Sequence, residues 1–122
     1  IGDIVSAFQK FAACHYDKLT GKMSRVNDFQ IVEKGSQLFK DATGKGYEEW
    51  LSDKELREMN MLFQRRHLIE HNNGMVDQKY IDKSGDSSYV IGQRLVVKES
   101  DALTLLAIIK KLGTGLLSMK EV

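Results

Sequence analysis

Apolar residues recur along the chain at the spacing of amphipathic helices in four stretches. The first covers residues 2–19, where apolar side chains three or four positions apart precede the stop signal Thr20-Gly21. The second begins near Ser24, a residue type that caps helices, and continues to Ala42, just before a pair of glycines. We expect a helix in each stretch. Gly35 weakens the second prediction, because glycine costs about 1 kcal/mol in a helix interior.

Two further helices are predicted in the second half of the chain. Ser52 and Glu55 have the spacing of a capping box, and the helix that they open is expected to end at Asn72, before an Asn-Gly pair. The last helix is expected to be capped by Ser100-Asp101. It is apolar nearly all round over residues 102–109, which indicates burial between other helices or against a partner surface.

The segment between these two helices has no regular pattern. Residues 74–98 contain several turn signals, and the β-branched stretches 89–91 and 95–97 are compatible with a small hairpin around Gly92. Loops of this length in small domains are more often functional than idle. Together the patterns predict an all-α fold: one domain over residues 1–122, built as an antiparallel bundle of four main helices.

Composition excludes several classes of protein. The 42% of hydrophobic residues in 122 exclude wholesale disorder, while no apolar run approaches the ~20 residues of a membrane span. A single cysteine excludes an internal disulfide, and the net charge of +1 excludes a strongly polybasic module. The first residue is Ile1 and no signal-peptide pattern follows, so we expect a cytoplasmic protein, without a membrane partner, that is a fragment of a longer chain.

The candidate chemistry lies in the second half of the helix that Ser52 opens. His67 to His71 reads H-x-x-E-H, the pattern of the inverted zinc peptidases, in which two histidines hold the metal and Glu70 activates water. A third ligand is required. The only later glutamates, Glu99 and Glu121, lie beside a helix cap and in the terminal tail, and neither is convincing. We therefore expect no metal.

A second motif overlaps the first. Arg66 and His71 are separated by four residues near the end of the predicted helix, His67 follows the arginine, and Asn72 follows the histidine. The stretch from Phe63 to Tyr80 resembles the motif-bearing helix and following turn of the HEPN superfamily, whose R-x4-H motif lies near the end of a core helix. The resemblance implies an HEPN-like helical fold over most of the chain.

What the resemblance implies is a metal-independent endoribonuclease that acts on RNA as a homodimer and needs no cofactor. Carried over to this chain, Arg66 would contact the scissile phosphate, His71 would transfer a proton, and His67 would assist or orient. Three residues inside and beside the motif are candidates for substrate binding: Arg65, Glu70 and Asn72. A role in defence or stress response follows by analogy alone.

Elementary chemistry agrees with these roles. RNA carries its own nucleophile, the 2′-hydroxyl, so the protein needs a proton-transfer group and a cation for the developing charge, and the product would be a 2′,3′-cyclic phosphate. Histidine and arginine supply both groups at neutral pH. Five positions along a helix turn by about 140°, so Arg66 and His71 are not expected to share one face. A two-fold dimer in which both copies contribute would relieve that difficulty.

Two simpler interpretations stand beside the nuclease. Arg65 and Arg66 with Glu70 have the spacing of an exposed salt-bridged face, and His71 near a helix C-terminus is favourable to the helix dipole without any catalysis. HEPN domains that have lost catalysis serve as nucleotide-binding or dimerisation modules. The sequence therefore leaves a non-catalytic module as the main alternative.

Overall fold

The computed structural model describes residues 2–120, and within that range the chain is built from helices. This confirms the all-α class; the only β-pairing among these residues is an isolated bridge between Met75 and Arg94. The helices are α1 (Gly2–Thr20), η1 (Val26–Phe29), α2 (Val32–Thr43), η2 (Tyr47–Glu49), α3 (Asp53–Asn72), α4 (Gln78–Ser84) and α5 (Glu99–Ser118). No helix in this part of the chain is long and apolar enough to cross a membrane.

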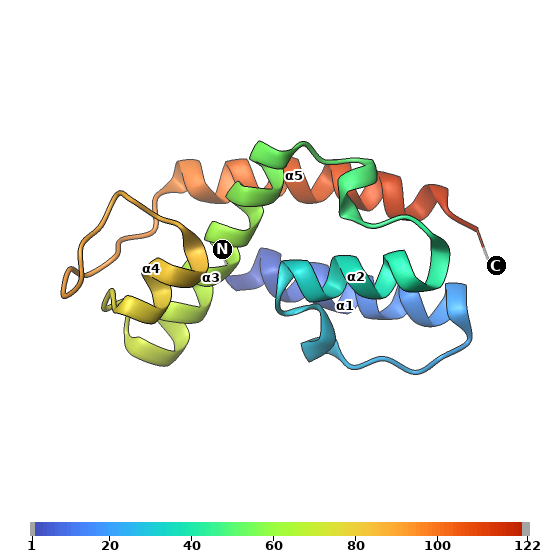
Figure 1. Ribbon diagram of the computed structural model, residues 1–122, viewed down its shortest axis with the longest axis horizontal. Coiled ribbons are helices and arrows are strands. Elements are labelled where there is room, and N and C mark those ends of the chain that lie inside the picture. Colours follow the sequence, from blue (N-terminus) through green and yellow to red (C-terminus); the bar gives the residue numbers. More distant parts are fainter. Residues whose placement is uncertain (1, 121–122) are drawn as a thin grey trace.

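Three helices follow the long axis of the molecule, and α3 crosses obliquely to them (Figure 1). In that view α1, α2 and α5 all run from left to right, and α3 runs back toward the lower left. The order therefore differs from the succession of antiparallel neighbours that we expected. It arises because segments 21–31 and 44–52 return the chain between α1 and α2 and between α2 and α3. Helix α3 packs against α1, α2, α4 and α5, which makes it the central element.

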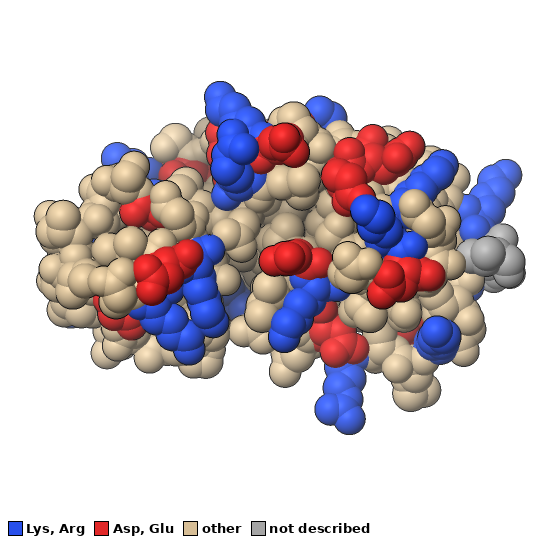
Figure 2. Space-filling view, in the orientation of Figure 1, with Lys and Arg blue, Asp and Glu red and all other residues tan. Residues whose placement is uncertain are grey.

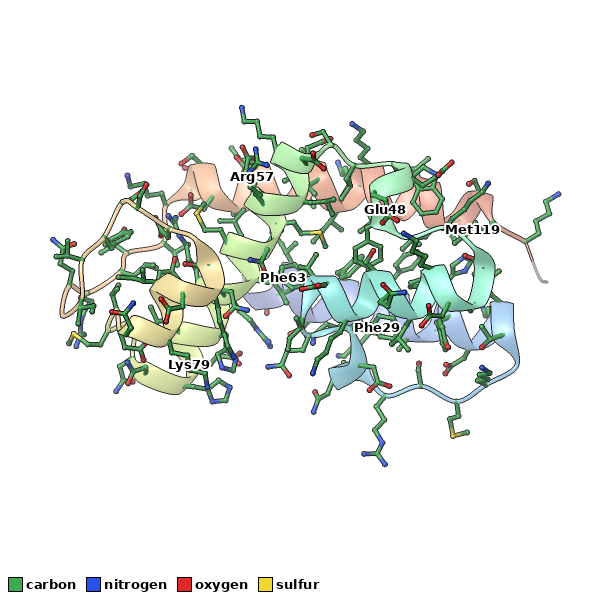
Figure 3. All side chains as sticks on the ribbon, viewed as in Figure 1. Phe29, Glu48, Arg57, Phe63, Lys79 and Met119 are labelled. Atoms are coloured by element: carbon green, nitrogen blue, oxygen red, sulfur yellow. The ribbon has the colours of Figure 1, made fainter. Side chains whose placement is uncertain are left out.

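The main core lies between α1, α2, α3 and α5. Aromatic rings dominate its centre: Phe8 lies edge-on to Phe63 and to Tyr47, with ring centroids 5.9 and 6.1 Å apart. Figure 3 shows Phe63 pointing inward from α3, between α1 and α2. Such a ring cluster fixes the orientation of α3, because edge-to-face pairs add to the gain from burial alone.

The ends of α3 confirm the sequence prediction. Ser52 accepts a hydrogen bond from the Glu55 amide, and the Glu55 carboxylate accepts one from the Ser52 amide, which completes the capping box. The helix ends at Asn72, where Asn73 adopts the left-handed conformation with φ of 54°. The second half of the helix therefore lies at its expected position.

The helix predicted from Ser24 to Ala42 is interrupted. Ser24 does not cap a helix; its amide donates to the Asp17 carboxylate and its hydroxyl donates to the Ala13 carbonyl, so it is tied to α1. A short 3-10 helix, η1, follows, and α2 begins only at Val32. The break turns Phe29 into the core, where it is 1% exposed.

The segment 74–98 is more ordered than the sequence indicated. It contains α4, which was not expected. The hairpin around Gly92 is absent. Residues 90–93 form a turn instead, and residues 92–95 pair with Gly74–Val76. A second, smaller core holds it together, formed by Leu68, Val76, Tyr80 and Leu95. Helix α5 begins at Glu99, slightly earlier than the expected Ser100-Asp101 cap, because Asp101 accepts a hydrogen bond from the Lys98 amide.

Candidate functional site

The R-x4-H residues line a polar cavity between three elements. We call it the motif cavity; its volume is about 510 Å³, and α1, η1 and the second half of α3 all contribute side chains. From α3 it is lined by Arg66, His67, Glu70 and His71. Although Arg66 and His71 are separated by 140° on an ideal helix, both border this one cavity. The expectation that a single straight helix positions them poorly for one phosphate stays a prediction.

Two neighbouring side chains hold Arg66 beside this cavity. Its Nη2 donates to the Glu70 carboxylate at 3.1 Å and to the Ser6 hydroxyl of α1 at 3.3 Å, and the side chain is only 16% exposed. Its Nε is buried and has no hydrogen-bond partner among residues 2–120. A buried donor without a partner is costly. The Glu70 carboxylate and the Ser6 hydroxyl thus fix the position of the guanidinium.

His67 and His71 form a pair of neighbouring imidazoles one helical turn apart. Their ring centroids are 4.4 Å apart, and the side chain of His71 is 60% exposed. Burial lowers the pKa of His67 below that of a free histidine, and the nearby charge of His71 lowers it further. Two imidazoles this close disfavour double protonation, so His67 is neutral at pH 7.

Gln30 selects one tautomer of His67. The Gln30 amide nitrogen lies 3.2 Å from Nδ1 of His67. Because an amide nitrogen can only donate, Nδ1 accepts, and the proton of the neutral ring is on Nε2. His67 is therefore a hydrogen-bond donor in the cavity, while the exposed ring of His71 remains the group that can exchange protons with a substrate.

Arg65 does not belong to this site, although the sequence made it a substrate-binding candidate. It lies on the other side of α3 and is 6% exposed. Its guanidinium pairs with Asp86 at 3.0 Å and Asp101 at 2.9 Å, and its Nε donates to the Tyr80 hydroxyl at 3.3 Å. A guanidinium held by two carboxylates and a phenol has its hydrogen-bonding capacity occupied within the fold. Arg65 is a structural residue.

Asn72 faces a second space, which we call the side cavity. This space, of about 200 Å³, lies between the end of α3 and α4 and shares His67 and His71 with the motif cavity. The Asn72 amide donates to the Met75 carbonyl at 2.7 Å and to Asp77 at 3.4 Å. It therefore closes the turn after α3. Glu70, by contrast, holds Arg66 and comes within 3.9 Å of His71.

Several residues of these cavities carried no recognisable signal in the sequence. Ser6 and Lys10 reach the motif cavity from α1, and Gln30 reaches it from the turn after η1. Lys79 and Lys83 of α4 line the side cavity. Their separation from the motif along the chain hides them, and α4 itself was not predicted.

Within residues 2–120 no group of three or more His, Cys, Asp or Glu side chains is placed to hold a metal ion, and Glu121 lies outside the described residues. No protein-family model, curated protein or solved structure matches this chain.

Proposed function

We propose that this chain is a metal-independent endoribonuclease of HEPN type that cleaves RNA by attack of the 2′-hydroxyl. The observation that supports it most is the convergence of Arg66, His67 and His71 on the motif cavity. A permanent cation, a neutral imidazole donor and an exposed imidazole are the groups that phosphodiester transfer within RNA requires. The HEPN-like helical bundle is part of the same proposal.

Each group has a distinct role in the proposed step. Arg66 donates to a non-bridging oxygen of the scissile phosphate and stabilises the charge that develops there. His67 donates from Nε2 to the same phosphate and orients it. His71 in its neutral form takes the proton of the 2′-hydroxyl as the oxygen attacks phosphorus. The bond from phosphorus to the 5′-oxygen then breaks, which leaves a 2′,3′-cyclic phosphate.

The leaving 5′-oxygen must also receive a proton. In the proposed homodimer, the protonated His71 of the second copy supplies it, so that the two imidazoles exchange roles over one turnover. A C₂ arrangement brings the same surface of both copies together and duplicates every group of the site. The dimer thus completes the proton balance, while each protomer already holds its own Arg66 beside its own His71.

Cleavage without metal is the primary test. Single-stranded RNA is incubated with the protein in EDTA, and the fragment ends are identified by mass. We expect 2′,3′-cyclic phosphate and 5′-hydroxyl ends, lost in Arg66→Ala and His71→Ala while helical content is unchanged. Lys22→Ala, an exposed residue that lines neither cavity, is the control and should cleave normally. Activity that persists in both site variants would overturn the proposal.

Mixing an inactive variant with the wild type tests the dimer. If both copies of His71 serve one site, an excess of His71→Ala protomers should suppress the activity of the wild-type protein, because each mixed dimer keeps only one of the two imidazoles. Sedimentation of the wild-type protein measures the dimer directly. A monomer that cleaves RNA would overturn the second-copy role of His71 and leave the Arg66 assignment intact.

A non-catalytic nucleotide-binding or dimerisation module remains the second candidate. The ion pair of Arg66 with Glu70 favours it, because i,i+4 pairs of this kind are common on helix surfaces without any catalytic role. Nucleotide binding that depends on Arg66, without cleavage of any of a varied set of RNAs, is the result expected of the module.

A further inference from the structure

A larger hollow lies nearer the start of α3, on the side that faces α2. It has a volume of about 760 Å³ and is bounded by α2, η2, α3 and the end of α4; we call it the α2–α3 hollow. Figure 2 shows the face of the molecule that carries it, with the recess near the centre of the view. Neither the R-x4-H motif nor the proposed proton transfer uses this space.

The walls of the hollow combine apolar and amide groups. Ile31, Val32 and Leu56 provide apolar surface, and Asn60 and Gln64 project from the facing side of α3. The Asn60 amide nitrogen donates to the Lys83 carbonyl, and Gln64 makes no side-chain hydrogen bond within residues 2–120. An apolar surface edged by amides suits a nucleobase, which has a flat apolar face and a polar rim.

The hollow continues into the proposed catalytic region. Gln64 and Lys83 line both the α2–α3 hollow and the side cavity. The side cavity in turn shares His67 and His71 with the motif cavity. The three spaces therefore lie next to one another along α3, and we call this series of spaces, from α2 to the histidine pair, the path.

Cations follow the α3 and α4 side of this path. Arg57, Lys83 and Lys79 are exposed and make no ion pair within 4.0 Å among residues 2–120. Figure 3 shows Arg57 near the start of α3 and Lys79 on α4. On the opposite rim Glu48 is neutralised by Lys40 at 2.9 Å, while Glu33 remains exposed. The free positive charge thus lies where a phosphate backbone would pass.

We propose that the α2–α3 hollow is a subsite for an unpaired base of single-stranded RNA, with Arg57, Lys83 and Lys79 contacting the phosphates that lead to the histidine pair. This inference rests on the proposed function, since it places the strand next to the cleaved phosphate. Only an unstacked, unpaired base can enter a recess in the protein surface, so the site selects single strands over duplexes.

Binding is tested with an RNA that cannot be cleaved. A fluorescein-labelled 2′-O-methyl oligonucleotide and the duplex of the same sequence are titrated with the protein, and anisotropy is read at several salt concentrations. We expect tighter binding of the single strand. Arg57→Ala and Lys83→Ala should each weaken it roughly fivefold at low salt and reduce the salt slope by about one.

Matched variants separate the base pocket from general electrostatics. Gln64→Ala should change the preference among homopolymers without changing the salt slope, because its amide carries no charge. Lys22→Ala, which lines none of the three spaces, should bind like the wild type. Equal affinity for duplex and single strand, or wild-type affinity in both Arg57→Ala and Lys83→Ala, overturns the inference.

The two proposals fail in different ways. Binding that depends on Arg57 and Lys83, without cleavage of unmodified RNA, retains the subsite and refutes the nuclease. Cleavage that is normal in both of these variants and lost in His71→Ala retains the nuclease and refutes the subsite.

Discussion

Within the site, the charge of His71 affects the pKa of His67, its neighbour one turn away on α3. The ring centroids of His71 and His67 are 4.4 Å apart. Burial is the largest cause of the lowered pKa of His67, and the charge of His71 is the next. We therefore expect His71→Gln to raise the pKa of His67 toward the ordinary histidine value. NMR titration of the imidazole protons between about pH 5 and 8 measures this directly.

Replacing Glu70 is the control for that titration, because the expected change in the pKa of His67 has the opposite sign. Its carboxylate raises the pKa of His67, so Glu70→Gln should lower the pKa further, in contrast to His71→Gln. An unchanged pKa of His67 in His71→Gln would show that the rings are not neighbours in solution, and would leave burial as the main cause of its lowered pKa.

The network around Arg65 is the strongest electrostatic feature of the fold. Burial raises the pKa of Asp86, but hydrogen bonds from Tyr80, the Ser88 amide and Arg65 outweigh it and hold that pKa below the ordinary value. Asp86→Ala leaves a buried guanidinium with Asp101 as its remaining carboxylate partner. We expect a loss of about 3 kcal/mol in the free energy of unfolding, measured by urea denaturation.

The pH dependence of that loss has a definite sign. Because the pKa of Asp86 is lowered in the folded protein, the unfolded chain binds a proton more readily. The contribution of Asp86 is therefore complete above the unfolded pKa of about 3.9 and declines as the pH falls below it. The wild type and Asp86→Ala should converge in stability at acid pH, whereas Asp41→Ala, on an exposed helix face, should match the wild type throughout.

At the residue level, the sequence identified Arg66 as the arginine of the motif but did not show that its neighbour Arg65 lies outside the site. Arg65 and Arg66 are adjacent and both basic, and helix geometry alone turns them about 100° apart. Which one faces inward depends on Asp86 and Asp101, which lie 21 and 36 positions further along the chain. No local pattern carries that information.

Helices whose start and end are marked by residues in their own sequence were predicted. Helices that depend on contacts with distant residues were not. The capping box at Ser52 and the left-handed Asn73 fix α3 from its own sequence. Helix α4 has seven residues, which is too short for periodicity to show, and it is stabilised by Tyr80 in the second core. The break before Val32 likewise exists because Phe29 is drawn into the main core.

The first turn of α4 offers a direct test of this view. The Asp77 carboxylate caps the helix by accepting a hydrogen bond from the Tyr80 amide at 2.8 Å. Asp77→Ala should lower the free energy of unfolding by about 1 kcal/mol, as measured by urea denaturation. Asp82→Ala on the exposed side of the same helix should cost less than about 0.5 kcal/mol. Equal losses would mean that the cap does not hold α4 in place.

For the molecule as a whole, the site exists only because distant elements meet. Ser6 from α1, Gln30 from the turn after η1 and Lys79 from α4 surround one end of α3. The sequence supplied the α3 side chains, since they form one contiguous motif. The rest of the site depends on the direction in which the aromatic core holds α3 across the other helices. The tendency of each segment to form a helix does not predict that direction.

The position of α5 depends on a close approach that only glycine permits. A Cβ at Gly115 would overlap the Trp50 ring, whereas a Cβ at Gly113, on the same helix, would lie 3.9 Å from Phe11. Gly115→Ala should therefore lower the free energy of unfolding by about 1–3 kcal/mol through overpacking. Gly113→Ala should raise it by up to about 1 kcal/mol, because alanine favours the helix.

This pair of variants separates packing from helix propensity, since the chemical change is identical in both. Thermal and urea denaturation give the two free energies, and circular dichroism checks that the helical content is retained. Because Trp50 follows η2, which leads into α3, displacement of its ring by Gly115→Ala should also shift the tryptophan fluorescence. If Gly115→Ala were as stable as Gly113→Ala, α5 would not pack on Trp50 as described, and α3 would be free of a constraint that helps to set its direction.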